Sequence, residues 1–224
     1  MTTADISKLI WSSRYRGTGT DGVAEAGIAD TWWRVARTMA SVEGNPEQWE
    51  RNFMDALEDF CFLPGGRILA GAGQGRDVTL FNCFVAGGLV DSLEGILESL
   101  KETAITMQHG GGIGLDFSPL RPSGSPAVRT GATASGPVSF MHVWDSMCET
   151  LLATGRRRGA MMGTLRCDHP DIEAFIEAKK DATALHNFNL SVLITDDFLG
   201  AVDDDREWLL AYPPGAEAMT RTHV

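Results

Sequence analysis

The sequence predicts an α/β domain preceded by a helical domain. Apolar residues recur at helical spacing through residues 28–60. Further along the chain, short apolar runs rich in branched and aromatic residues alternate with helical patterns, and glycine-rich turns separate them. Such alternation is typical of a parallel sheet with right-handed crossovers. We therefore expect a helical domain over residues 1–60 and an α/β domain over residues 61–224.

Apolar patterns place the main helices and strands. Two helices are predicted in residues 28–39 and 49–60, because a Gly-Asn-Pro break at residues 44–46 separates two apolar helical patterns. The α/β domain is expected to begin with a strand at residues 80–85, whose mostly apolar side chains predict burial on both faces. A similar run at residues 187–194 predicts a later strand.

Polar residues and a proline mark where further helices begin. Asp91 and Ser92 are suited to the N-terminal cap of a helix, because their side chains can accept hydrogen bonds from its first backbone N–H groups. Pro137 suits the first turn of a second helix, where its missing N–H costs nothing. A third, acid-capped helix is expected to begin at Asp168.

Composition limits the classes of partner. The chain has 224 residues, 43% of them hydrophobic, and its 19 basic and 30 acidic residues give a net charge of −11. This charge disfavours direct binding to nucleic acid. No apolar run reaches membrane-spanning length, and residues 1–17 lack the apolar core and cleavage site of a signal peptide. The sequence therefore predicts a cytoplasmic protein without a membrane partner.

Two glycine-containing loops are candidate anion sites. The glycines within residues 110–114 would let several backbone N–H groups approach a phosphate, and a helix-ending turn is the alternative. The arginine run at residues 156–158 could close over an anion, and a solvated surface loop is the alternative there. No Gly-Lys-Ser/Thr follows the glycine cluster, and the cluster follows a predicted helix rather than a strand, which argues against the known nucleotide-binding loops.

The cysteines do not form a metal or disulfide motif. Cys61, Cys83, Cys148 and Cys167 lie far apart and include no Cys-x-x-Cys pair, which argues against a zinc ribbon or a thioredoxin-type motif. Cys83, in a predicted strand, is typical of a buried core residue. Cys167 and His169 could form half of a metal site, but no second pair lies at ligand spacing, so no metal site is predicted.

Three stretches of sequence resemble the catalytic large subunit of ribonucleotide reductase. They are LPGGRILAGAG at residues 63–73, QHGGGIGLDFSPLR at residues 108–121 and RGAMMGTLRCDHPDI at residues 158–172. They are most similar to the class II, adenosylcobalamin-dependent branch, which residues 10–37 also resemble. The resemblance implies conversion of ribonucleotides to deoxyribonucleotides by radical chemistry. It also implies that the first part of a ten-stranded α/β barrel, incomplete in this chain, follows the helical domain.

The resemblance assigns roles to particular residues. It makes Cys83 the redox-active cysteine that delivers reducing equivalents to substrate. The implied substrate contacts are Pro64, Gly65, Asn82, Gly111, Gly112 and Arg158. The implied binding residues for an allosteric effector, a deoxynucleoside triphosphate or ATP, are Asp91, Ser92 and Arg121. The loop that links effector to substrate base is implied to contain Gly155, Arg156, Arg157, Gly159, Ala160, Met161 and Met162.

The same resemblance implies the cofactor and partners. These are adenosylcobalamin, a ribonucleotide substrate, a thioredoxin-type reductant and a second copy of the chain, paired through the helices at residues 91–107 and 137–153. The match is expected to weaken after Phe198, and residues 213–224 are expected to be irregular.

The family's Asn-x-Cys-x-Glu motif, which carries the radical cysteine and a glutamate, is absent from this sequence. We therefore expect the isolated chain to be inactive. It could be one piece of a split enzyme completed by a second polypeptide, a truncated product, or a non-catalytic nucleotide-binding and regulatory relative. An unrelated α/β scaffold whose glycine loops are only turns is the remaining alternative.

Overall fold

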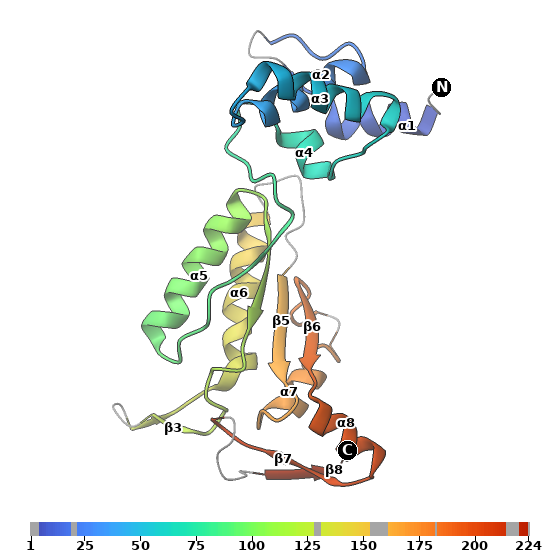
Figure 1. Ribbon diagram of the computed structural model, residues 1–224. Coiled ribbons are helices and arrows are strands. Elements are labelled where there is room, and N and C mark those ends of the chain that lie inside the picture. Colours follow the sequence, from blue (N-terminus) through green and yellow to red (C-terminus); the bar gives the residue numbers. More distant parts are fainter. Residues whose placement is uncertain are drawn as a thin grey trace. The chain divides into compact units, whose positions relative to one another are not determined.

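The computed structural model describes residues 5–18, 22–127, 131–152, 161–181, 183–213 and 220–223. The chain divides into two compact units, Met1–Asn82 and Cys83–Val224 (Figure 1). The boundary lies later than the one predicted after residue 60. The reason is that Ile68, Leu69 and Leu80 pack into the helical core. Within the described residues, no helix combines the length and apolar character that crossing a bilayer requires.

The first unit is helical. It contains α1 (Asp5–Ile10), the π-helical turn η1 (Trp11–Tyr15), α2 (Ile28–Ala40), α3 (Pro46–Leu57), the 3-10 turn η2 (Glu58–Phe60) and α4 (Gly66–Gly71). Asn45 caps α3 by accepting a hydrogen bond from the backbone N–H of Gln48 at 3.3 Å. Trp32 and Val35 of α2 share a buried cluster with Leu57 of α3. The two predicted helices are therefore confirmed.

The second unit is built around a four-stranded parallel sheet. Its strands are β1 (Cys83–Val85), β2 (Gly112–Asp116), β5 (Met161–Arg166) and β6 (Phe188–Leu193), in the order β1-β2-β5-β6. The connections contain α5 (Leu93–Gln108), α6 (Gly136–Leu152) and α7 (Ile172–Glu177). Figure 1 shows α5 and α6 side by side along one side of the sheet. The predicted α/β class is confirmed.

The core lies between the sheet and its helices. Alternate strand residues, including Ile113, Leu165 and Phe188, are buried in one cluster with Trp144 of α6. Shorter elements complete the unit: an antiparallel pair of β3 (Pro126–Ala127) and β4 (Ala132–Thr133), then α8 (Asp196–Asp203), then an antiparallel pair of β7 (Glu207–Leu210) and β8 (Thr220–His223).

Three expectations about these elements were wrong. The first strand covers only Cys83–Val85 and is not buried on both faces, because only Phe84 packs against the core, while Cys83 is exposed and Val85 is 93% exposed. The acid-capped helix begins at Ile172 rather than at Asp168, whose carboxylate instead pairs with Arg166. The end of the chain is not wholly irregular, since β8 pairs with β7.

Candidate functional site

Cys83 lies on the face of the sheet opposite the helices. Side chains of a strand alternate between its two faces. Phe84 packs against the core on the helical side, so Cys83 and Val85 point the other way, where both are exposed. Cys83 is a free thiol, and its register partner on β2 is Gly112, which has no side chain. The thiol is therefore open to a ligand above this face.

Gly111 has a structural reason to be glycine. It is buried, and a Cβ atom there would lie 2.8 Å from Cε2 of Phe84 and 2.9 Å from Cγ2 of Thr106. Real Cβ atoms do not approach so closely, so Phe84 and the end of α5 together require glycine at this position. Packing between α5 and β1 explains this glycine without any ligand.

The cysteines differ in reactivity. Cys61 and Cys83 are exposed, whereas Cys148 and Cys167 are buried. Burial raises the pKa of the Cys148 thiol to about 11, and the negative charge of Asp145 adds to the shift. Burial also raises the pKa of Cys167. Because the thiolate is the reactive form, burial makes both of these thiols poor nucleophiles at neutral pH.

We expect iodoacetamide at pH 8 to alkylate Cys61 and Cys83 in the native chain, and Cys148 and Cys167 only after unfolding. Peptide mass spectrometry after timed quenching measures each site, with Cys61 as the control for an exposed thiol. A Cys83 that resists alkylation as strongly as Cys148 would contradict its placement on the exposed face.

Three predicted effector residues lie together at the start of α5. The Nε atom of Arg121 donates to Oδ2 of Asp91 at 2.7 Å, and Nη2 reaches the backbone oxygen of Asp91 at 3.3 Å. The hydroxyl oxygen of Ser92 accepts from the backbone N–H of Gly95 at 3.1 Å and so caps the helix. The predicted cap is confirmed for Ser92, whereas the Asp91 carboxylate pairs with Arg121 instead. A guanidinium beside a helix N-terminus attracts anions, while the carboxylate can accept hydrogen bonds from a base or a sugar.

Tyr212 also contacts this group of residues, and sequence reasoning missed it. Its hydroxyl lies 3.3 Å from Oδ2 of Asp91 and donates to the backbone oxygen of Pro119 at 2.6 Å. The residue lies between β7 and β8, far from Asp91 in sequence. No local motif signals a contact across 121 positions, so only the fold reveals it.

The predicted loop between effector and substrate is only partly described. Gly155, Arg156, Arg157, Arg158, Gly159 and Ala160 lie outside the described residues. Met161 and Met162, which the resemblance also assigns to this loop, are the first two residues of β5. Met161 is buried and its backbone N–H donates to the backbone oxygen of Asn187 at 3.0 Å. Met162 lies on the opposite face and is 43% exposed.

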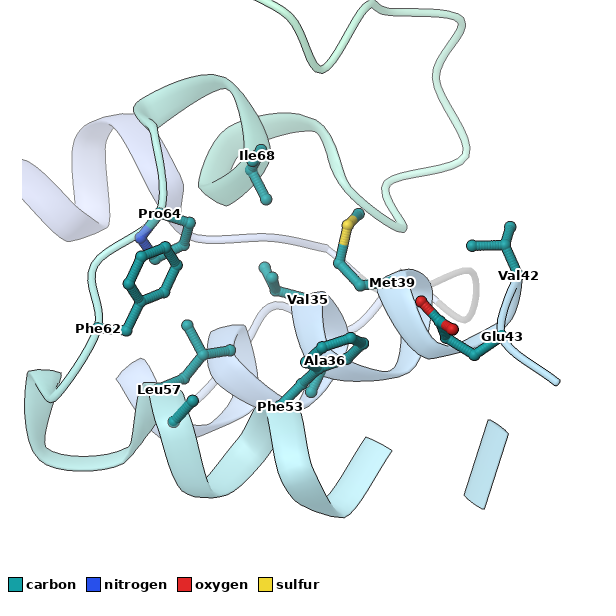
Figure 2. A pocket seen from close by; sticks show the side chains of 11 residues that line it. Val35, Ala36, Met39, Val42, Glu43, Phe53, Leu57, Phe62, Pro64 and Ile68 are labelled. Carbon is teal, nitrogen blue, oxygen red and sulfur yellow. The ribbon is translucent and has the colours of Figure 1, made fainter. Parts of the chain in front are cut away.

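Three other predicted substrate residues, Pro64, Gly65 and Asn82, belong to the first unit. Gly65 is the residue before α4, and Pro64 helps to line an apolar pocket of about 360 Å³ (Figure 2). Figure 2 shows side chains of α2, α3 and the segment 62–68 around it. Glu43 is the one charged lining residue. The pocket has no basic side chain with which to bind a phosphate.

The described residues contain no group of three or more His, Cys, Asp and Glu side chains that could hold a metal ion. His169, which the sequence places near Cys167, is 2% exposed. Its Nε2 atom is 2.9 Å from the backbone oxygen of Leu120, and its Nδ1 accepts from the backbone N–H of Asp171 at 3.0 Å. Both ring nitrogens thus have partners within the protein.

Comparison with known proteins identifies the family. The all-alpha domain of ribonucleotide reductase matches residues 1–77, and the barrel domain of ribonucleotide reductase matches residues 81–223. The chain therefore belongs to the ribonucleotide reductase family. The barrel match extends well past Phe198, so the expectation that the resemblance weakens there was wrong.

Individual relatives refine this placement. The chain is 39% identical over 194 residues to the vitamin B12-dependent ribonucleoside-diphosphate reductase of Mycobacterium tuberculosis, covering 84% of this chain and 28% of that relative. It is 37% identical over 202 residues to the enzyme of the same name from Thermoplasma acidophilum, covering 90% and 26%. The α subunit of ribonucleoside-diphosphate reductase from Helicobacter pylori is 28% identical over 193 residues, covering 84% and 24%. The chain thus spans only 24–28% of the length of these relatives.

Proposed function

We propose that this chain forms part of the catalytic subunit of an adenosylcobalamin-dependent ribonucleotide reductase. The observation that carries the proposal is the exposed Cys83 thiol on β1, beside the side-chain-free Gly112 of β2. The names of the relatives support the cofactor, since two of them are called vitamin B12-dependent. The substrate is a ribonucleotide, and Pro64, Gly65, Asn82, Gly111, Gly112 and Arg158 are its proposed contacts.

Cys83 supplies reducing equivalents in this proposal. Replacing a C–OH bond by C–H takes two electrons and two protons, which a pair of thiols provides by forming a disulfide. Cys83 is one thiol of the pair, and a second cysteine of the complete enzyme is the other. A thioredoxin-type dithiol then reduces the disulfide by exchange. Exposure of Cys83 is consistent with such exchange, which requires access to the sulfur.

The apolar pocket of the first unit and the buried His169 do not fit a corrinoid site. The pocket of about 360 Å³ in the first unit lies at the small end of the range for drug-sized ligands and is too small for a corrin with its axial groups. His169, the buried histidine near Cys167, uses both ring nitrogens within the protein. We therefore assign no residue of this chain to adenosylcobalamin and derive no step through it.

Asp91, Ser92 and Arg121 form the proposed effector site, together with the loop residues 155–162. A deoxynucleoside triphosphate or ATP would place its phosphates near Arg121 and its base or sugar near Asp91. An effector that favours one arrangement of the loop changes which substrate base binds best, because the two sites then share one equilibrium.

The exposed faces of α5 and α6 are the proposed contact with a second copy. Leu93, Leu97 and Ile105 of α5 and Val143 of α6 are large apolar side chains that remain 42–65% exposed. Burying such residues between two copies would remove apolar surface from water.

We expect Asp91→Ala and Arg121→Ala to weaken effector binding by roughly 1.5–3 kcal/mol each, because each removes a charged hydrogen-bonding group. Equilibrium dialysis with radiolabelled dATP measures the affinity. Asp204→Ala and Arg206→Ala are matched controls, since they break an exposed ion pair of 3.0 Å elsewhere in the unit. Unchanged affinity in the first two variants would place the effector elsewhere.

A reconstitution assay tests the proposed reaction. The purified chain is combined with lysate of its source, adenosylcobalamin, a dithiol, a ribonucleotide and a deoxynucleotide effector, and deoxyribonucleotide is quantified. Product that requires the chain, the lysate and the cobalamin together supports the reductase. Effector binding without any Cys83-dependent product would instead favour a regulatory nucleotide-binding protein. Failure to bind any nucleoside triphosphate would contradict the proposed effector site.

A further inference from the structure

We propose that Tyr212, supported by His169, is a positioning residue for the Asp91 and Arg121 pair, and so for effector binding. The inference deepens the proposed function and rests on it. Neither Tyr212 nor His169 is among the residues that the family resemblance assigns to the effector.

The Tyr212 hydroxyl joins two segments that meet at the ion pair. It donates to the backbone oxygen of Pro119 at 2.6 Å and lies 3.3 Å from Oδ2 of Asp91, a second acceptor. The same Oδ2 atom accepts from Nε of Arg121 at 2.7 Å. One hydroxyl therefore restrains both the carboxylate and the chain two residues before the guanidinium-bearing residue.

His169 restrains Leu120, the residue after Pro119, in the same way. Its Nε2–H donates to the backbone oxygen of Leu120 at 2.9 Å, while Nδ1 accepts from the backbone N–H of Asp171 at 3.0 Å. These partners fit the tautomer with its proton on Nε2. The carbonyl groups of the two residues immediately before Arg121 are thus each held by a side chain from later in the sequence.

The two restraining side chains also support each other. The rings of His169 and Tyr212 make an edge-to-face contact with centroids 5.8 Å apart. The backbone next to Tyr212 is fixed as well, because the N–H of Ala211 donates to the backbone oxygen of Asp168 at 2.8 Å. Tyr212 is therefore anchored independently of the residues that it positions.

Electrostatics keep the Tyr212 hydroxyl a donor. Burial raises its pKa, and the negative charge of Asp91 raises it further. The phenol therefore stays protonated at neutral pH, so its proton remains available to Pro119 and Asp91. A guanidinium whose backbone and ion-pair partner are both fixed loses less conformational freedom when a phosphate binds to it, which favours binding.

The test uses the full chain and dATP as the probe. Tyr212→Phe keeps the ring contact with His169 but removes the hydroxyl, and we expect it to weaken dATP binding about three- to tenfold, the effect of one lost hydrogen bond. Tyr15→Phe is the matched control, because Tyr15 is the other of the two tyrosines in the sequence and lies in the helical unit. Its affinity should equal that of the wild type.

A second variant separates positioning from a general loss of stability. If Tyr212 acts through Asp91, adding Tyr212→Phe to Asp91→Ala should change little. The double variant should bind dATP at most about twofold more weakly than Asp91→Ala alone. If the losses of dATP affinity in the two single variants add up fully in the double variant, the inference is overturned. It is also overturned if Tyr212→Phe binds dATP as tightly as the wild type while Asp91→Ala binds it more weakly. A wild-type chain that binds no dATP would overturn the proposed effector site itself, and the inference with it.

Discussion

Cys83→Ser will abolish multiple-turnover reduction in the complete enzyme. In the proposed function the two electrons come from a pair of thiols that is oxidised to a disulfide, and a serine hydroxyl cannot take part in that disulfide, so the variant cannot supply them. The substitution replaces sulfur by oxygen at an exposed position and should leave the fold intact. Deoxyribonucleotide formation with a thioredoxin-type reductant measures the effect.

The Cys83→Ser experiment has two internal controls. Cys61→Ser changes the other exposed cysteine, which lies in the helical unit, and should retain full turnover. Affinity for dATP should be unchanged in Cys83→Ser, because Cys83 is not one of the residues that contact Asp91 or Arg121. Sustained turnover by Cys83→Ser would show that the reaction does not require the Cys83 thiol.

Glu25→Ala will destabilise the helical unit by about 3–5 kcal/mol, the usual cost of breaking a buried ion pair. Oε1 of Glu25 lies 2.6 Å from Nε of Arg34, and the two side chains are only 9% and 13% exposed. Oε2 accepts from the Thr31 hydroxyl at 2.6 Å and from the backbone N–H of Gly17 at 2.7 Å. The substitution leaves these donors and the Arg34 charge without their acceptor.

Urea unfolding monitored by circular dichroism measures this loss. Glu98→Ala is the control, since Glu98 forms an exposed helical pair with Lys101 and should cost at most about 1 kcal/mol. Equal losses in the two variants would mean that the network around Glu25 adds nothing beyond a surface pair.

The same network makes the stability of this unit depend on pH. Burial alone would raise the pKa of Glu25, but hydrogen bonds from Arg34, Thr31 and Gly17 outweigh it and lower the pKa. A pKa lower in the folded than in the unfolded state gives stability that is complete above the unfolded value and is lost as pH falls through the folded value. The free energy of unfolding should therefore fall less steeply with decreasing pH in Glu25→Gln than in Glu98→Gln.

Local signals in the sequence were enough to predict much of the fold. The pattern over α2 and α3 and the Ser92 cap of α5 depend on neighbours three or four residues away, and these predictions were confirmed. The exposure of β1 could not be predicted in the same way. Its apolar residues fit a strand that is covered on one face or on both, and only the packing of the other elements against the sheet decides between them.

Prediction of the candidate site from the sequence relied more on family resemblance than on residue chemistry. Taken alone, Cys83 is typical of a buried core residue, yet it is exposed, because the face of a strand that meets the helices is set by tertiary packing. Asp91 and Arg121 are 30 positions apart and share no motif. Their ion pair, like the contact of Tyr212 with Asp91, exists only once the chain has folded.

The redox state of Cys83 after a single turnover tests the central claim most directly. The complete enzyme reacts with ribonucleotide and adenosylcobalamin without external reductant, is quenched in acid, and is alkylated before peptide mass spectrometry. The proposed function predicts that the Cys83 peptide becomes resistant to alkylation in proportion to the deoxyribonucleotide formed, and recovers on reduction of disulfides. Deoxyribonucleotide formed while Cys83 stays fully alkylatable would contradict it.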